Sequence, residues 1–187
     1  MLEIEVKIRV ENPESTAQKL KELGAEVDKV RHNEENTLYD SVTRQLQRKG
    51  CALRLRRMGK KTFLTFKGAR KKSRKFKIRE EYETEVKNEK QMKNILKSLG
   101  FQPVFEYKKH RTVFRKKKLK ICLDETSVGT FQELEGQRSD IVRFAQALRI
   151  SKKDFITKDY IQLIQEAEQT GKKAIPGNGA PGIPTKS

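Results

Sequence analysis

Charged side chains alternate along most of the strand-like segments of this sequence, and their spacing is the first indication of chemistry. Side chains two residues apart in a strand lie on the same face of a sheet. In the segment 2–11, Glu3, Glu5, Lys7 and Arg9 therefore share one face, and the residues between them are apolar. The same spacing recurs at Arg54 and Arg56, at Lys75, Lys77, Arg79, Glu81, Glu83 and Glu85, at Lys109 and Arg111, and at Glu133 and Glu135.

For any one strand, the ordinary explanation is an antiparallel sheet with one solvated face whose charges pair across strands. Two features favour a functional explanation here. Acidic residues neighbour acidic ones, as at Glu3 and Glu5, and basic residues neighbour basic ones, as at Arg54 and Arg56. The pattern also recurs on nearly every strand, while the predicted helices supply apolar faces. We therefore expect a closed sheet whose charged face points inward, the reverse of the usual small barrel.

A lumen of this kind suits a triphosphate. The guanidinium group of Arg donates two parallel hydrogen bonds to phosphate oxygens, and Lys adds compact positive charge. Carboxylates repel phosphate, so their presence implies a hard cation between the two. Mg²⁺ or Mn²⁺ prefers oxygen ligands and commonly bridges a few carboxylates to substrate phosphates.

Strands separated by a few helices account for the rest of the pattern. Helices are predicted after Asn12-Pro13, after Asn88, over 140–148 and over 158–168. Strands are predicted at 2–11, 25–31, 37–40, 52–58, 62–67, 75–86, 104–115, 119–124 and 130–135. The expected class is α+β, with the helices packed outside the sheet.

The ordered motifs of the chain resemble the CYTH, or triphosphate tunnel metalloenzyme, superfamily. The opening Glu3-x-Glu5-x-Lys7 matches the family's ExExK signature. The resemblance continues through residues 36–40, 52–56, 64–68, Arg79-x-Glu81-x-Glu83, Lys109-x-Arg111 and 123–135. Tyr160 and Leu163 resemble the closing helix of the cyclase-like branch. Together the matches cover about residues 1–168.

The resemblance implies a closed eight-stranded antiparallel tunnel and assigns roles within it. The expected phosphate-binding and catalytic residues are Lys7, Arg54, Arg56, Lys67, Arg79, Lys109 and Arg111. The expected ligands of one or two Mg²⁺ or Mn²⁺ ions are Glu3, Glu5, Glu81, Glu83, Asp124, Glu133 and Glu135. Arg9 and Glu85 have the right parity but lie at strand ends, where a solvated role fits equally well. His32 and His110 are interpreted as structural or exposed.

Three functions remain open. Hydrolysis of tripolyphosphate, thiamine triphosphate or a nucleoside triphosphate is narrowly favoured, because water is the simplest nucleophile. A class IV adenylyl cyclase reaction, from ATP to cyclic AMP and pyrophosphate, would use the same lumen. The third is a non-catalytic binder of polyphosphate or RNA. Aromatic residues make up only 7% of the chain, so stacking of nucleic acid bases is disfavoured.

Composition sets the remaining limits. The 187 residues carry 43 Lys and Arg and a net charge of +18, which favours polyanionic ligands. A tunnel domain over 1–170 and a disordered Gly- and Pro-rich tail over 171–187 are predicted. Cys51 and Cys122 lack metal-site or disulfide spacing, and no apolar run reaches membrane-spanning length. We expect a cytoplasmic protein, and a homodimer is compatible with the sequence.

Overall fold

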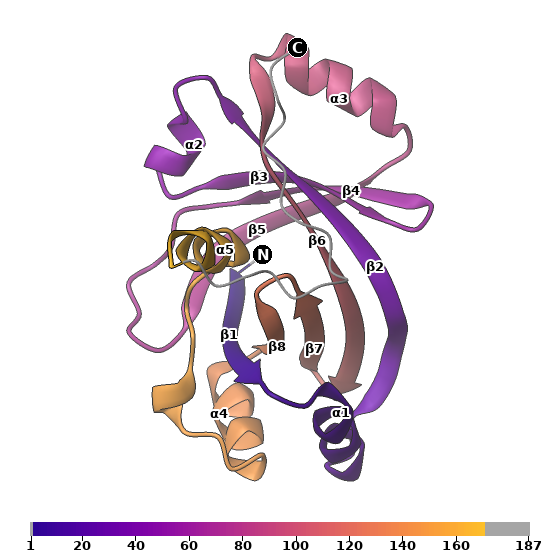
Figure 1. Ribbon diagram of the computed structural model, residues 1–187, viewed down its shortest axis with the longest axis vertical. Helices are drawn as coiled ribbons and strands as arrows, with labels where there is room; N and C mark the ends of the chain where they lie inside the picture. The colour runs from indigo at the N-terminus through magenta and orange to yellow at the C-terminus, as the bar shows by residue number, and fades with distance from the viewer. Residues whose placement is uncertain (1, 171–187) are drawn as a thin grey trace.

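The computed structural model describes residues 2–170 and contains a closed barrel of eight antiparallel strands (Figure 1). The strands are β1 (Leu2–Val10), β2 (Glu26–Ser41), β3 (Ala52–Met58), β4 (Lys61–Lys67), β5 (Lys77–Val86), β6 (Phe101–Lys116), β7 (Leu119–Thr126) and β8 (Gly129–Glu135). The helices are α1 (Pro13–Glu22), α2 (Gln45–Arg48), α3 (Glu89–Ser98), α4 (Arg138–Ala147), the short 3-10 helix η1 (Lys152–Asp154) and α5 (Tyr160–Gln169). The expected tail over 171–187 lies outside the described residues.

β1 closes the barrel. Around the sheet the strands follow the order β1-β5-β4-β3-β2-β6-β7-β8. Residues 2–5 of β1 pair with β5, and residues 5–10 pair with β8. Because β1 pairs with strands on both sides, the sheet is closed. Glu3, Glu5 and Lys7 of β1 face the space that it encloses. The predicted α+β class, with a charged closed sheet and helices outside, is confirmed.

Two predictions about the elements were wrong, and one short helix was missed. The separate strands predicted at 25–31 and 37–40 are one strand, β2, which pairs along its length with β6. The polar run at 32–37 interrupts the apolar alternation, so the sequence in this region resembles a loop between two strands. Lys75, expected on a strand face, lies in the loop before β5. The four-residue helix α2 was not predicted.

The helices cover the outside of the barrel at both ends (Figure 1). α1 and α4 bring Leu20, Ile141 and Phe144 onto the outward apolar faces of β1, β7 and β8, forming the largest apolar cluster. α3 packs Leu96 against Tyr39 and Leu55 at the other end. Asn12 and Asn88 cap α1 and α3 as predicted, each accepting a hydrogen bond from a backbone N–H three residues later. The core therefore lies outside the sheet, which leaves its inner face for charge.

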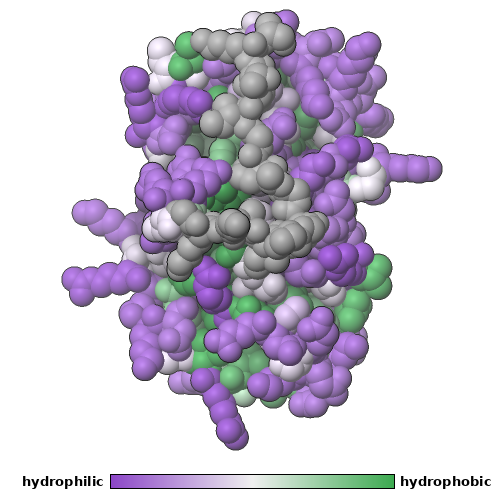
Figure 2. Space-filling view, in the orientation of Figure 1, coloured by the Kyte–Doolittle hydropathy of each residue, from purple (hydrophilic) through white to green (hydrophobic). Residues whose placement is uncertain are grey.

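The first turns of α5 pack against the barrel beside the lumen. Its Tyr160 and Ile164 pack against Phe105, Tyr107 and Phe131. The segment leading to α5 is tied to β1, because the backbones of Lys7 and Ile156 exchange two hydrogen bonds of 3.0 and 2.8 Å. The face seen in Figure 2 is predominantly hydrophilic. Among residues 2–170, every helix is too short or too polar to span a bilayer.

Candidate active site

The barrel lumen is a narrow space lined by charge. Nine Lys or Arg residues and seven Asp or Glu residues line a cavity of about 110 Å³. Asp124 and Glu34 lie just behind this lining, buried at 0% and 2% exposure. Nine carboxylates thus balance nine cations, so a bound polyanion would leave the site with excess negative charge. The chemistry of the lumen favours a polyanion that arrives with its own cations.

One side of the lumen is densely paired, and we call it the buried wall: Glu5 and Lys7 of β1, Lys109 and Arg111 of β6, Asp124 of β7 and Glu133 of β8. All six residues are less than 10% exposed. Arg111 donates both to Asp124, at 2.5 Å, and to Glu133, at 2.6 Å. Lys7 lies 2.8 Å from Glu133. These contacts hold the pKa of the Glu133 carboxyl well below its usual range, although burial acts to raise it.

Tyr160 completes the buried wall from α5. Its hydroxyl donates to Asp124 Oδ2 at 2.6 Å, beside the donation from Lys109 at 2.9 Å. The ammonium groups of Lys7 and Lys109 each lie 4.9 Å from the centre of the tyrosine ring. Since a cation over an aromatic face is attracted to its quadrupole, Tyr160 holds two lysines in place. The resemblance associated Tyr160 with the closing helix but predicted none of these contacts.

The opposite side is less enclosed, and we call it the open wall: Arg54 and Arg56 of β3, Lys67 of β4, and Glu81 and Glu83 of β5. Its side chains are 13–31% exposed. Arg56 donates to both oxygens of Glu83 at 3.1 and 3.0 Å. The contact of Arg54 with Glu83 is longer, 3.7 Å. The Nε atoms of both arginines are buried without a hydrogen-bond partner, so both guanidinium groups keep free donors.

Glu3 and Glu81 form a like-charge pair across Lys67. The lysine ammonium lies 2.8 Å from an oxygen of each. Burial, with the nearby charges of Glu5 and Glu81, raises the pKa of Glu3 to about 7. Burial acts in the same direction on Glu81, but Lys67 and the hydrogen bond with Glu3 hold its pKa at about 2. One of the two carboxyls is thus near protonation at neutral pH, which marks a local excess of negative charge.

Arg79 is the exception among the lumen cations. It is only 4% exposed, yet no carboxylate of the described residues lies within ion-pair distance of it, and its Nε has no hydrogen-bond partner. Burial and the neighbouring Arg70 lower its pKa. Burying an unpaired charge costs several kcal/mol. The geometry is that of a binding group for an anion.

The structure brings nearly all of the predicted site residues together. Six of the seven expected metal ligands and all seven expected phosphate-binding residues line the lumen. Asp124 lies behind the lining, where Arg111, Lys109 and Tyr160 contact it. Glu135 is paired with Lys120 at 2.7 Å. Arg9 and Glu85 lie outside the lumen lining, Arg9 donating to the Val128 carbonyl and Glu85 pairing with Lys61.

The motif comparison did not assign Lys77, Lys120 and Asp159 of the lining, or Glu34 behind it. Glu34 of β2 lies 3.4 Å from Arg56 and 3.5 Å from Lys109, so it bridges the two walls. Lys77 donates to Glu5 at 2.6 Å, and burial lowers its pKa to about 8. Lys77 has the same parity as Arg79, which was a usable signal. Glu34 stands in a polar run without alternation, and the sequence carries no signal for it.

His32 is half-buried, and its Nε2 lies 3.6 Å from a carboxylate oxygen of Glu34. Cys122 is buried, and burial raises the pKa of its thiol to about 12. A thiol with this pKa stays protonated at neutral pH and is unreactive. Neither His32 nor Cys122 lines the lumen.

The carboxylate oxygens of the lumen are the type of ligand that a hard divalent cation prefers. Glu3, Glu5, Glu81 and Glu133 offer carboxylate oxygens, and the Glu3–Glu81 pair lacks a full counter-charge. Within residues 2–170, however, no three acidic, His or Cys side chains converge on one point. Each carboxylate is held by Lys or Arg, so a metal would have to replace these partners.

The match to known proteins spans the described chain. The family model for the CYTH domain matches residues 1–174. A protein of Methanocaldococcus jannaschii, provisionally named an adenylate cyclase, is 30% identical over 174 residues, which is 87% of this chain and 98% of the relative.

Two solved structures have a similar fold. One from Pyrococcus horikoshii is 26% identical with a TM-score of 0.73, over 86% of this chain and 98% of its own. One from Hippeastrum, described as a provisionally named adenylyl cyclase that reveals a dominant triphosphatase activity, is 21% identical with a TM-score of 0.64, over 95% and 100%. The chain, with its closed barrel and charged lumen, belongs to the CYTH domain family.

Proposed function

We propose that this protein is a divalent-metal-dependent triphosphatase whose substrate phosphates lie in the barrel lumen. The observation that carries the proposal is the buried, unpaired Arg79 among a ring of cations whose guanidinium donors are only partly used. A phosphate chain supplies the missing acceptors, and Arg is suited to phosphate because its fork donates two parallel hydrogen bonds.

The roles divide between the two walls. Arg54, Arg56, Lys67 and Arg79 would bind and orient the phosphate chain, because their donors are the less completely used ones. Lys7, Lys109 and Arg111 would supply fixed positive charge from the buried wall. Catalysis of this kind depends on positioning and electrostatic stabilisation, with little covalent work for the protein.

The proposed metal ligands are the lumen carboxylates Glu3, Glu5, Glu81, Glu83, Glu133 and Glu135, with Asp124 behind them. Glu3 and Glu81 share the single ammonium group of Lys67. A bound Mg²⁺ or Mn²⁺ would neutralise phosphate charge and lower the pKa of a water molecule.

A class IV adenylyl cyclase is the second candidate. The provisional name of the 30% identical relative favours it, and a charged lumen serves attack by a ribose hydroxyl as well as attack by water. Hydrolysis is preferred because the described lumen is narrow and a water molecule needs the least space.

Product analysis separates the two. The protein is incubated with ATP, tripolyphosphate and thiamine triphosphate, each with Mg²⁺ and with Mn²⁺. Release of orthophosphate is the expected result. Cyclic AMP with pyrophosphate would establish the cyclase instead. No product, together with metal-independent binding of RNA or polyphosphate that weakens steeply with salt, would identify a non-catalytic binder.

A further inference from the structure

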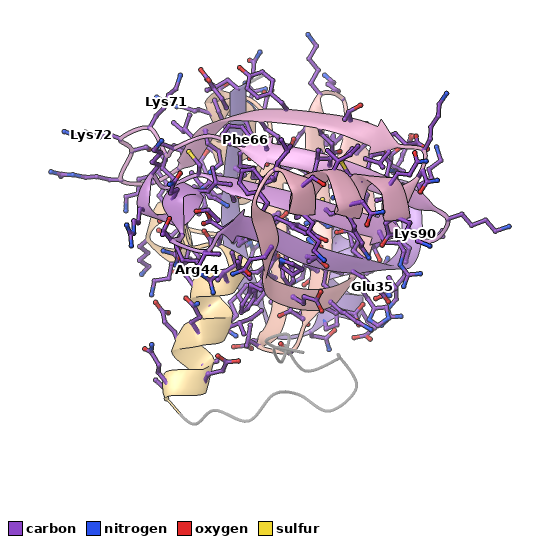
Figure 3. All side chains as sticks on the ribbon, turned by 90° about the horizontal axis from the view of Figure 1, so that it is seen from above. Glu35, Arg44, Phe66, Lys71, Lys72 and Lys90 are labelled. Atoms are coloured by element: carbon purple, nitrogen blue, oxygen red, sulfur yellow. The ribbon has the colours of Figure 1, made fainter. Side chains whose placement is uncertain are left out.

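The loop between β4 and β5, residues 68–76, carries a dense group of basic side chains outside the lumen. Five of its nine residues are Lys or Arg, and none is acidic. Figure 3 shows Lys71 and Lys72 on this loop at the outside of the molecule, away from the barrel. The loop therefore presents a concentrated positive charge to the surroundings.

Hydrogen bonds fix the course of this loop. The backbone N–H groups of Gly68 and Lys71 donate to the carbonyls of Glu80 and Ile78, each at 2.8 Å. The N–H of Phe76 donates to the hydroxyl of a serine within the loop at 3.1 Å. A loop fixed in this way keeps its like charges close together, and the resulting positive field attracts anions.

Two other basic segments adjoin the loop. Lys75 Nζ lies 3.5 Å from the Lys152 carbonyl of η1, and the rings of Phe76 and Phe155 meet edge to face with centres 6.1 Å apart. The guanidinium group of Arg138, at the start of α4, lies 5.8 Å from the centre of the Phe76 ring. Figure 1 shows the loop and η1 on the same side of the molecule. We call this surface the basic ridge, and its members are Arg70, Lys71, Lys72, Arg74, Lys75, Arg138, Lys152 and Lys153.

Acidic residues neutralise only part of the basic ridge. Asp159 pairs with Arg70 at 2.7 Å, and Glu80 lies 3.7 Å from Lys71. Asp154 accepts a hydrogen bond from a backbone N–H at the start of η1. The remaining five lysines and arginines of the loop and η1 form no ion pair with an acid of residues 2–170: Lys72, Arg74, Lys75, Lys152 and Lys153. The ridge therefore has a surplus of positive charge, which indicates a polyanionic partner.

The kind of polyanion follows from what the ridge lacks. Among the described residues, the exposed large apolar side chains are Leu2, Val27, Val30, Val42, Tyr82, Ile95 and Leu99, and none belongs to the ridge. Phe76 and Phe155 are partly buried against each other. Protein interfaces have an apolar or aromatic centre, and helices that bind a membrane surface insert an apolar face. Proteins that bind single strands stack the bases on exposed aromatic rings.

A nucleic acid duplex needs none of these features. Its phosphates accept hydrogen bonds from Arg and Lys side chains, and its high charge density makes such binding strong at low salt. Contacts of this kind position the duplex without reading its bases.

We infer that the basic ridge binds the phosphate backbone of a nucleic acid duplex, without regard to base sequence. No residue of the ridge lines the lumen. The inference is therefore independent of the proposed function, and a duplex and a triphosphate would bind at separate sites.

The test compares two variants with the same change of net charge. Lys72→Glu/Arg74→Glu alters the ridge, and Lys87→Glu/Lys90→Glu alters two exposed lysines around the start of α3. Figure 3 shows Lys90 on the side of the molecule opposite Lys71 and Lys72. Fluorescence anisotropy measures the Kd of labelled DNA duplexes of about 20 base pairs and of unrelated sequence, at several salt concentrations.

The wild type should bind all of the duplexes alike, with a Kd of about 1–100 μM at about 100 mM salt. The ridge variant should raise this Kd by about tenfold or more and reduce the slope of log affinity against log salt by about 2, because two phosphate contacts are lost. The control variant should stay within about threefold of the wild type. Equal losses in both variants would overturn the ridge, because net charge alone would then explain binding.

Three further outcomes decide the assignment. Arg79→Met, inside the lumen, should bind the duplex as the wild type does, and a loss there would place the nucleic acid in the lumen and overturn the inference. Wild-type binding to phosphatidylglycerol vesicles but not to the duplex would also overturn it, in favour of a membrane surface. The ridge variant should keep the tripolyphosphate Kd, measured with Mg²⁺, within about twofold of the wild type. A larger change would mean that the ridge belongs to the triphosphate site.

Discussion

The buried wall and the open wall of the lumen use the same residue types for different ends. On the buried wall each carboxylate has two or three cationic or hydroxyl partners, and Asp124 has no exposed surface. On the open wall Arg56 and Glu83 are 13% and 31% exposed, and the Nε atoms of Arg54 and Arg56 have no partner. The difference indicates that the buried wall holds the barrel together, whereas the open wall and Arg79 keep donors for a ligand.

The largest expected effect is on stability. Asp124→Ala removes a shared partner of Arg111, Lys109 and Tyr160 at once. Among the described residues, each of the two buried cations is then left with one acidic partner, Glu133 for Arg111 and the more distant Glu34 for Lys109. We expect the free energy of unfolding to fall by about 3–5 kcal/mol. Glu83→Gln on the open wall should cost about 1 kcal/mol or less, because the Glu83 side chain is 31% exposed and its ion pair with Arg56 is partly solvated. Denaturant unfolding of both variants measures this difference, and equal losses would erase the distinction between the walls.

The next effect separates binding from stability at one residue. Arg79→Met removes a buried charge that has no carboxylate of residues 2–170 within ion-pair distance, and it keeps the side chain's length. The free energy of unfolding should stay constant or rise by about 1–4 kcal/mol. The Kd for tripolyphosphate with Mg²⁺ should rise about 100-fold, since a donor aimed at phosphate is lost.

The matched control is Arg74→Met, in the exposed loop before β5, which should alter neither quantity. A destabilised Arg79→Met variant that binds tripolyphosphate normally would show that Arg79 supports the fold and is not the anion-binding group.

Metal removal tests the balance of charge. Because nine carboxylates lie in or behind a lining with nine cations, tripolyphosphate should bind weakly when EDTA replaces Mg²⁺. We expect affinity to fall by about 10-fold or more. Calorimetry at constant ionic strength measures it, with Glu81→Gln as the comparison. That variant removes one negative charge beside Glu3, so its metal-free affinity should exceed that of the wild type. Affinity indifferent to metal in both proteins would place the carboxylates outside the binding reaction.

The alternation of charge predicted the lumen well, for a physical reason. A strand places every second side chain on one face, so Lys7, Arg56 and Arg111 could be placed inside the barrel once closure was assumed. Alternation does not predict which basic side chain forms an ion pair with which acidic one. The pairing of Arg56 with Glu83, and the lack of an ion pair for Arg79 within the described part of the chain, depend on register across strands.

The cavity of about 840 Å³ lined by residues of α2 and α5 could not be predicted, for a similar reason. Its α2 side depends on Asp40 accepting hydrogen bonds from backbone N–H groups up to seven residues away, and its α5 side depends on Arg70 donating to Asp159, which is 89 residues distant. The predicted break between two strands at 32–36 hid Glu34, because a polar run inside one long strand has the composition of a loop.

The smallest expected effect is the pH dependence of the stability that His32 gains from Glu34. The Glu34 carboxylate lies 3.6 Å from His32 Nε2 and raises the pKa of that imidazole, with added help from the Val30 carbonyl. A histidine whose pKa is raised on folding stabilises the folded state most when it is protonated. Its contribution is full below the unfolded pKa of about 6.5 and is lost as pH rises through the folded value. The difference in unfolding free energy between wild type and His32→Gln should therefore be largest near pH 5 and shrink towards pH 8. Denaturant titrations across that range measure it, with His110→Gln as the matched histidine on the neighbouring strand. A difference that grows with pH would mean that His32 is held neutral, and that Glu34 draws its counter-charge from the lumen cations alone.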